Sequence, residues 1–273
     1  MLFSIKTARE VVAQVKLSYG DDLTDLSLPF LQHRLWRMLG RLGMRRSEDL
    51  LARLRQGDPA FYADFLQLLW PRTTEMFRDP SFWRLLRDTV IPLLTQSGHP
   101  LRVWQAAFDS GEELYSLLIL LEELGMDNSV VYSSYMGAHM LRGAESGCLV
   151  SGSLKVHEGN YQRFNMEGDI HRYVQESASG EVRFILPSLS AVTFVAQAVG
   201  FQALAEPVDL ILCRNQLLYF ASGLSARNVA VLASSLVKGG MLGVGIRECL
   251  AGTENTAIFT LVNGEERVYR CVG

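Results

Sequence analysis

The sequence predicts an α/β protein preceded by a helical N-terminal domain, and three observations indicate this fold class. The apolar run Val208–Cys213 has polar neighbours, which is typical of a central parallel strand covered on both faces. After residue 97, apolar segments of strand length alternate with helical segments, as they do in βαβ units. Before residue 97 the apolar residues recur only at helical spacing. We therefore expect an all-α domain over residues 1–96 and an α/β domain over residues 97–273.

The N-terminal region is expected to contain several amphipathic helices. Apolar residues recur three and four positions apart in segments at 31–42, 50–54 and 61–69. Gly43 would end the first segment, Ser47 would cap the second, and Asp58-Pro59 would start the third. A further helix is expected from about Pro80 to Leu94.

The second domain is expected to hold a mostly parallel sheet that ends in a hairpin. Strands are predicted at about 101–107, 129–134, 190–196, 208–213 and 240–246, with helices at 111–124, 137–146 and 222–237. The pair Asn263-Gly264 is a typical hairpin turn between residues 257–262 and 266–272. Residues 148–188 fit neither pattern and are expected to form a small inserted subdomain.

Composition limits the functions that the chain could have. The 26 basic and 29 acidic side chains give a net charge of −3, which argues against binding to nucleic acid. The four cysteines form no Cys-x-x-Cys pair, and the histidines lack ligand-like spacing, so we expect reduced thiols and no metal site. The sequence shows neither a leader pattern nor a long apolar segment. We expect a cytoplasmic protein without membrane insertion.

Two loops are candidates for a ligand site at the carboxyl edge of the predicted sheet. Arg214 and Asn215 follow the predicted central strand, where ligands of open α/β sheets bind. In the loop Ala106–Glu113, Gly111 would let the backbone approach a ligand at the start of a helix. The alternative is a simple helix cap, with Glu112 and Glu113 complementing the helix dipole.

Several segments resemble, in the same order, motifs of the CheR-type chemotaxis receptor methyltransferases, which methylate receptor glutamates with S-adenosylmethionine. The segments are Thr73–Asp79, Arg102–Ser116, Met140–Gly147, Cys213–Phe220 and Lys238–Glu248. The resemblance extends from about residue 28 to the C-terminal residue. It implies a Rossmann-like seven-stranded methyltransferase domain with a small insertion.

The resemblance also implies roles for individual residues. The implied cofactor-binding residues are Thr74, Arg78, Ala106, Gly111, Glu112, Tyr135, Arg214 and Asn215. Glu112 would hold the ammonium group of S-adenosylmethionine. Arg78 and Tyr219 would act at the methyl-transfer point, where an arginine orients the incoming glutamate through its planar fork. Alternatively, Arg78 pairs with Asp79, and Tyr219 is part of the core or of the junction between the domains.

Other positions depart from the family pattern in ways that would weaken cofactor binding. Phe108 and Asp109 stand where the family has small or hydroxyl residues. Tyr135 stands where the family has the aspartate that binds the ribose hydroxyls, and a tyrosine cannot supply a bidentate carboxylate. Ala198 stands at the place of a family asparagine. The alternative is that Tyr135 stacks on the adenine.

The last candidate site is basic. Arg34, Arg37, Arg41 and Arg45 recur three or four residues apart and would form one face of a helix. The family uses a basic helix of this domain to approach acidic receptor helices, so an acidic helical partner such as a chemoreceptor signalling domain is implied. The alternative is a solvated face without a partner.

Three functions remain open at this point. The first is a divergent CheR-type homologue with weakened or lost catalysis, which acts in chemosensory-type signalling through protein contacts. The second is an active chemoreceptor glutamate O-methyltransferase. The third is a sensor that binds S-adenosylmethionine or another nucleotide without turnover.

Overall fold

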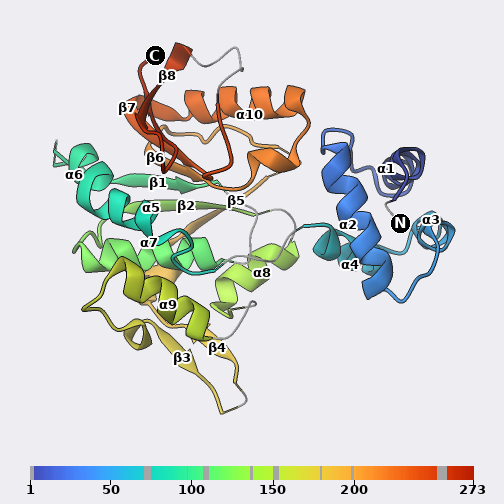
Figure 1. Cartoon of the computed structure of the whole chain (residues 1–273), viewed down its shortest axis with the longest axis horizontal. Coiled ribbons are helices and arrows are strands. Elements are labelled where there is room, and N and C mark those ends of the chain that lie inside the picture. Colours follow the sequence, from blue (N-terminus) through green and yellow to red (C-terminus); the bar gives the residue numbers. More distant parts are fainter. Residues whose placement is uncertain are drawn as a thin grey trace.

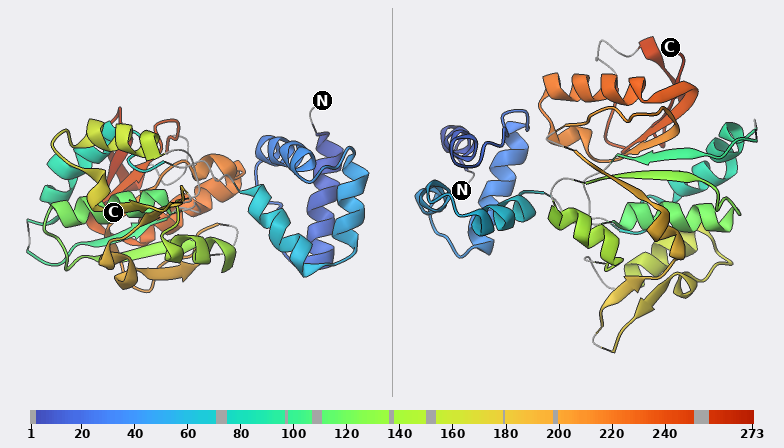
Figure 2. Two further views of the ribbon diagram at one scale, coloured as in Figure 1. Left: turned by 90° about the horizontal axis from the view of Figure 1, so that it is seen from below. Right: turned by 180° about the vertical axis from the view of Figure 1, so that it is seen from behind.

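The computed structural model describes residues 3–70, 75–96, 98–106, 111–135, 138–149, 154–178, 180–197, 200–250 and 257–273. These residues form two lobes, one of helices only and one built on a sheet (Figures 1 and 2). The N-terminal end of the chain lies in the helical lobe, and the C-terminal end lies at the edge of the sheet (Figure 1).

The helical lobe is the predicted all-α domain. Its helices are α1 (Ile5–Tyr19), α2 (Leu28–Arg41), α3 (Ser47–Arg55) and α4 (Pro59–Leu69). Asp58 caps α4 by accepting the Ala60 amide at 3.0 Å, as the sequence predicts. Ser47 is the first residue of α3 instead of its cap, because Arg46 occupies the cap position. Helix α1 was not predicted, although it has a buried stripe of Ala8, Val11, Val12 and Val15.

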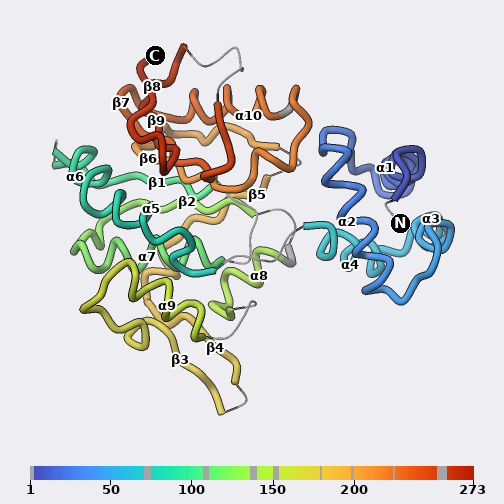
Figure 3. Tube along the Cα trace, in the orientation of Figure 1, coloured from blue at the N-terminus to red at the C-terminus, as the bar shows by residue number. Residues whose placement is uncertain are grey.

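The predicted helix at 80–94 consists of three pieces. They are α5 (Pro80–Leu85), a π-helical turn η1 (Leu86–Val90) and α6 (Ile91–Leu94). The π turn precedes Pro92, whose ring and missing N–H are incompatible with a regular helix at that point. Phe82, Trp83 and Val90 pack with Val103 and Leu210 of the sheet, and the trace in Figure 3 shows α5 and α6 beside the sheet, away from α1–α4. The packing therefore puts this segment in the sheet lobe and moves the boundary expected at residue 96 to before α5.

The central sheet has seven strands in the order β5-β2-β1-β6-β7-β9-β8. The strands are β1 (Arg102–Gln105), β2 (Val130–Tyr135), β5 (Thr193–Ala196), β6 (Val208–Cys213), β7 (Leu236–Val244), β8 (Phe259–Asn263) and β9 (Val268–Cys271). Strand β6 pairs in parallel with β1 and β7, which confirms the prediction of a central parallel strand at Val208–Cys213. The last two strands form the predicted antiparallel hairpin, but its turn is at residues 264–267 instead of Asn263-Gly264, because Asn263 still pairs with Val268.

Both faces of the sheet are covered, which explains why β6 is apolar except at Asp209, a buried carboxylate that pairs with Arg102. Leu210 and Leu212 pack on the side of α7 (Glu112–Glu123). Val208, Ile211 and Cys213 pack on the side of α10 (Ser222–Ser234). Figure 1 shows these two helices on opposite sides of the strands. A shorter helix, α8 (Ala138–Ser146), follows β2.

The expected insertion contains a helix and a small hairpin. The helix is α9 (Leu154–Phe164), and the hairpin pairs β3 (Val174–Glu176) with β4 (Val182–Phe184). Short 3-10 turns lie at η2 (Ile170–Arg172), η3 (Pro187–Ala191) and η4 (Leu217–Tyr219). On α9, the buried His157 accepts the Met76 amide at 3.1 Å, and Asn160 donates to the Met76 carbonyl at 3.1 Å. The insertion thus holds the segment that leads to Arg78.

Within the described ranges, no helix is both long and apolar enough to cross a bilayer. Over the same residues, no cluster of three or more histidine, cysteine, aspartate or glutamate side chains could hold a metal ion.

Candidate active site

The candidate site lies where β1, β2, β6 and β7 end. Ala106 follows β1 and is buried, and its amide donates to the Leu212 carbonyl at 2.8 Å. Gly111 precedes α7, and Arg214 and Asn215 follow β6. Four residues of the sequence analysis, Thr74, Phe108, Asp109 and Ala198, lie outside the described residues.

Gly111 is required by its conformation and by a close neighbour. Its φ of +106° lies in the region that favours glycine, and a Cβ at this position would lie 2.7 Å from the ring of Tyr115. That ring is fixed because the Tyr115 hydroxyl donates to the Ala144 carbonyl at 2.9 Å and the ring stacks on Phe184. A side chain at position 111 would therefore clash with Tyr115, and the next residue, Glu112, is fully buried.

Arg214 is the centre of a buried ionic cluster. One guanidinium nitrogen, Nη1, lies 3.3 Å from Glu113 Oε1 and donates to the Arg78 carbonyl at 3.3 Å. The other, Nη2, pairs with Asp79 Oδ2. The guanidinium also stacks on Phe82, 4.2 Å from the ring centroid. The side chains of Arg214 and Glu113 are only 3% and 9% exposed.

Glu113 depends on this arginine for its charge. Burial raises the pKa of the Glu113 carboxyl, and the neighbouring Arg214 opposes that rise. The Arg214 guanidinium thus holds two carboxylates and a backbone carbonyl, while its Nε has no hydrogen-bond partner within the described residues. These contacts position the segment that carries Arg78. The expected role of Arg214 in cofactor binding stays a prediction.

That segment is unusual in its backbone. Phe77 and Asp79 have φ values of +51° and +56°, and neither is glycine. The Phe77 amide donates to Ser116 Oγ at 2.8 Å, and Asp79 is held by Arg214. Contacts on both sides of Arg78 fix this strained turn, which is typical of functional sites. Arg78 itself is exposed, so its side chain is accessible from solvent.

A second buried carboxylate fixes the loop after β6. Glu248 accepts the backbone amides of Asn215 at 2.8 Å, Gly245 at 2.7 Å and Leu218 at 3.2 Å. Burial raises the pKa of the Glu248 carboxyl, and these amides oppose the rise. Asn215 has a φ of +56°, and its Oδ1 would lie 2.6 Å from a Cβ at position 245. These contacts explain how Gly245 and Glu248 pack against the loop that contains Arg214 and Asn215.

Tyr219 faces the other lobe. Its ring lies 4.8 Å from that of Phe30 and 6.4 Å from that of Trp70, measured between centroids. The Ser27 amide donates to the Tyr219 carbonyl at 2.8 Å. These contacts give Tyr219 a structural role at the junction of the lobes, and its role in methyl transfer stays a prediction.

The end of β2 is lined by hydroxyl groups. Ser133 donates to Gln105 Oε1 at 2.7 Å, and Trp104 Nε1 donates to Ser134 Oγ at 2.8 Å. Tyr135 ends the strand with a half-buried side chain, and its carbonyl accepts the Gln197 amide at 3.0 Å. The side chain at the end of this strand is therefore a phenol, without a carboxylate for ribose.

The four arginines of the N-terminal domain do not form one free helix face. Arg34 donates to the carbonyls of Leu68, Leu69 and Trp70 at 2.5, 2.6 and 2.7 Å and so caps the end of α4. Arg45 lies beyond α2, which ends at Arg41. Only Arg37 and Arg41 are exposed on the helix. Our expectation of a common docking face was therefore wrong for Arg34, because its donors serve the fold.

Sequence reasoning missed the residues that organise this site. Asp79 was considered only as a partner of Arg78, and Glu113 only as a charge that complements the helix dipole. Both bind Arg214. Glu248 was noted only as part of a motif. One signal could have identified Glu113. It is an acidic residue in a segment whose apolar pattern predicts burial, and such a residue needs a buried arginine as a partner.

Comparisons with known proteins find relatives of similar length and a more distant solved structure. The chain is 27% identical over 263 residues to "Putative methyltransferase Cher3" of Pseudomonas putida, covering 96% of this chain and 95% of the relative. It is 28% identical over 255 residues to "Chemotaxis protein methyltransferase" of Listeria innocua, covering 91% and 92%. Among solved structures, the N-methyltransferase NodS of Bradyrhizobium japonicum in complex with S-adenosyl-L-homocysteine is 14% identical. That match has a TM-score of 0.37 and covers 70% of this chain and 87% of NodS.

A family model decides the assignment. The model described as "CheR methyltransferase, SAM binding domain" matches residues 72–268. This range begins just before the strained turn that carries Arg78 and runs into the last strand of the sheet. With well over half of its length matched, the chain belongs to the CheR methyltransferase family.

Proposed function

We propose that the chain is a CheR-type homologue whose methyl transfer is weakened by poor cofactor binding and which acts in chemosensory-type signalling through protein contacts. The observation that carries this proposal is the phenol of Tyr135 at the end of β2, in the place of an aspartate. A carboxylate at this point accepts hydrogen bonds from two ribose hydroxyls, whereas a phenol makes one weaker hydrogen bond.

The methionine end of S-adenosylmethionine fits the described residues better than the ribose end. At the end of β1, Gln105 Nε2 is buried without a hydrogen-bond partner in the described part of the chain. Close by, Gly111 and the buried Glu112 begin α7. A polar, charged group would satisfy such a site, and Glu112 would hold its ammonium. Bound S-adenosylmethionine would supply an electrophilic methyl group.

Residues of the chain would bind and orient the carboxylate that accepts the methyl group. Arg78 is exposed on a turn fixed by Arg214 and Ser116, so its guanidinium can hold an ionised carboxylate in one orientation. Orientation contributes most when the nucleophile is already charged, because no strong base is needed. This arrangement favours a second candidate function, an active protein-glutamate methyltransferase.

Calorimetric titration with S-adenosylmethionine and S-adenosylhomocysteine tests the proposal. We expect dissociation constants weaker than about 100 µM, because the loss of charged hydrogen bonds at about 1.5–3 kcal/mol each lowers affinity by orders of magnitude. A dissociation constant of about 10 µM or tighter would contradict weak binding. Tight binding with transfer of labelled methyl to receptor glutamates would establish the active enzyme, and tight binding without transfer would indicate a sensor.

The protein contact that we propose involves Arg37 and Arg41 on α2 and an acidic helical partner, such as a chemoreceptor signalling domain. We expect Arg37→Glu with Arg41→Glu to abolish association with such a partner and to leave the melting temperature nearly unchanged, since both side chains are exposed. Binding should also weaken with salt, because exposed charges are screened over about 10 Å at 0.1 M. Pull-down with purified receptor domains measures this. Undiminished binding of the variant at high salt would place the contact elsewhere.

A further inference from the structure

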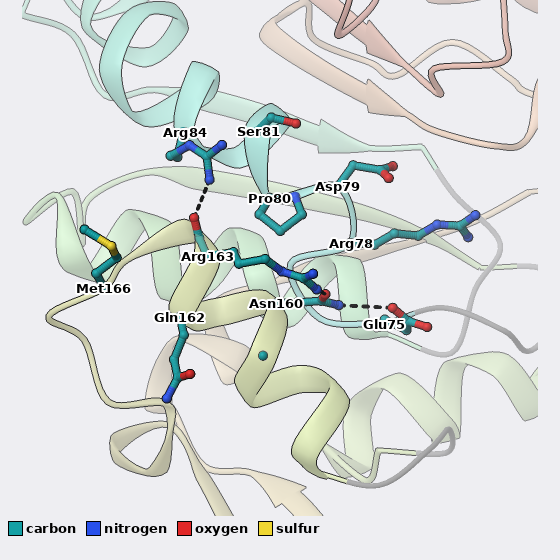
Figure 4. Close-up of a pocket in the computed structure, with 11 residues that line it drawn as sticks. Glu75, Arg78, Asp79, Pro80, Ser81, Arg84, Asn160, Gln162, Arg163 and Met166 are labelled. Atoms are coloured by element: carbon teal, nitrogen blue, oxygen red, sulfur yellow. Dashed lines mark hydrogen bonds between the residues drawn. The ribbon is translucent and has the colours of Figure 1, made fainter.

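A groove runs between α5 and α9 beside the strained turn (Figure 4). It encloses about 880 Å³, and its lining includes Arg78, Arg84, Arg163, Glu75, Asp79 and Met166. We call it the α5–α9 groove. It is open to solvent and large enough for several side chains of a bound segment.

The positive charges of three arginines in the α5–α9 groove are not compensated by ion pairs within the described residues. Arg84 donates to the Arg163 carbonyl, and Arg163 donates to Asn160 Oδ1, but within the described residues neither they nor Arg78 form an ion pair. Of the two acidic side chains of the groove, Asp79 pairs with Arg214, whereas Glu75 accepts a hydrogen bond from Asn160 at 3.0 Å and keeps its negative charge. The three guanidinium groups outnumber this one carboxylate, so the groove favours an acidic ligand.

The position of these groups indicates an extended ligand. Arg84 comes from α5 and Arg163 from α9, and Figure 4 shows Arg78 pointing away from the end where Arg84 lies. A single small anion needs donors that converge on one point, whereas these donors are distributed along the groove. Met166 is 90% exposed at the rim and could contact an apolar side chain of a bound segment.

We propose that the α5–α9 groove binds an acidic segment of the protein substrate next to the acceptor glutamate. This inference rests on the proposed function for the nature of the substrate, because Arg78 would hold the acceptor at one end of the groove. Arg84 and Arg163 would bind carboxylates that neighbour it in the substrate. Complementary charge of this kind selects the partner and speeds its encounter more than it adds affinity.

Fluorescence anisotropy with a short labelled peptide tests the groove without requiring turnover. The probes are a peptide with several glutamates around one acceptor glutamate and a twin with glutamine at the flanking positions. Arg84→Glu with Arg163→Glu should weaken binding of the acidic peptide about tenfold or more at low salt. The matched control is Lys238→Glu with Arg270→Glu, which makes the same change of charge at exposed positions outside the groove and should change affinity less than about twofold. A second variant, Met166→Glu, adds a charge at the exposed rim without disturbing a buried contact and should also weaken binding.

The following outcomes would contradict or support the proposal. The proposal is overturned if the acidic peptide binds no better than its twin with glutamine. It is also overturned if the groove variants, including Met166→Glu, bind as the unaltered chain does. It is overturned as well if only Arg37→Glu with Arg41→Glu loses the peptide, since α2 would then be the site. Calorimetry with S-adenosylmethionine on the same samples tests the proposed function separately. Peptide binding in the groove together with a dissociation constant for S-adenosylmethionine of about 10 µM or tighter would support the groove and contradict the proposed weak cofactor binding.

Discussion

Replacing Arg214 by methionine is expected to lower the free energy of unfolding by about 3–5 kcal/mol, because it leaves a buried carboxylate without its partner. Glu113 is buried and would lose the one cation with which it forms an ion pair among the described residues. Asp79 and the Arg78 carbonyl would lose the donors that fix the strained turn. Urea denaturation measures the change.

A matched control separates the cluster from a general effect of losing an arginine. Arg78→Met makes the same substitution at an exposed neighbour and should change the free energy of unfolding by less than about 0.5 kcal/mol. Arg214→Lys keeps the charge, but one ammonium cannot reach Glu113, Asp79 and the Arg78 carbonyl together, so we expect an intermediate loss.

A double variant examines the cause of the loss. Adding Glu113→Gln to Arg214→Met removes the uncompensated charge, so the double variant should be more stable than the sum of the two single changes predicts. Strict additivity, or equal effects of Arg214→Met and Arg78→Met, would show that the buried ion pair does not hold the turn.

Much of the sheet lobe could be predicted because its pattern is local. Val208–Cys213 has the same bounds in the sequence prediction and in the structure, since a strand packed on both faces is mostly apolar and Arg214 ends it. The helix at 80–94 was predicted, but it was assigned to the helical domain instead of the sheet lobe. Its apolar period is that of any amphipathic helix, and only contacts with Val103 and Leu210 assign it to the sheet lobe.

Helix α9 was missed because two of its core positions are polar. Leu154, Tyr161 and Phe164 keep helical spacing, but His157 and Asn160 interrupt the apolar stripe between them. Both are buried and bind the backbone of Met76, so they serve as core residues through hydrogen bonds. A pattern read from hydrophobicity alone counts such residues as exposed.

The ionic cluster could not be read from the sequence for another reason. Arg214 is separated by 135 residues from Asp79 and by 101 residues from Glu113. No spacing rule connects positions that far apart, and each residue also has a plausible local role. The sequence therefore showed which residues lie near the carboxyl edge, but it did not show that Arg214 holds Asp79 and Glu113.

The other large effect is expected at the end of β2. Tyr135→Asp should strengthen S-adenosylmethionine binding by about tenfold to a hundredfold, because hydrogen bonds to a charged group contribute about 1.5–3 kcal/mol. Tyr135 is half-buried at a strand end and pairs through its backbone with β5, so the side chain can change while the sheet stays intact. Adding Ala198→Asn should strengthen binding further, provided that Phe108 leaves the loop accessible.

Two further substitutions at the same position identify the cause. Tyr135→Asn has the shape of the aspartate without its charge and should gain less affinity, since an amide makes weaker bonds to ribose hydroxyls. Tyr135→Phe keeps the ring and removes the hydroxyl, so it should bind as the unaltered chain does if the ring stacks on adenine. Should Tyr135→Asp remain folded and bind more weakly than the unaltered chain, the tyrosine itself contacts the cofactor. The family's carboxylate would then have been replaced by an aromatic surface, and weak binding would need another cause.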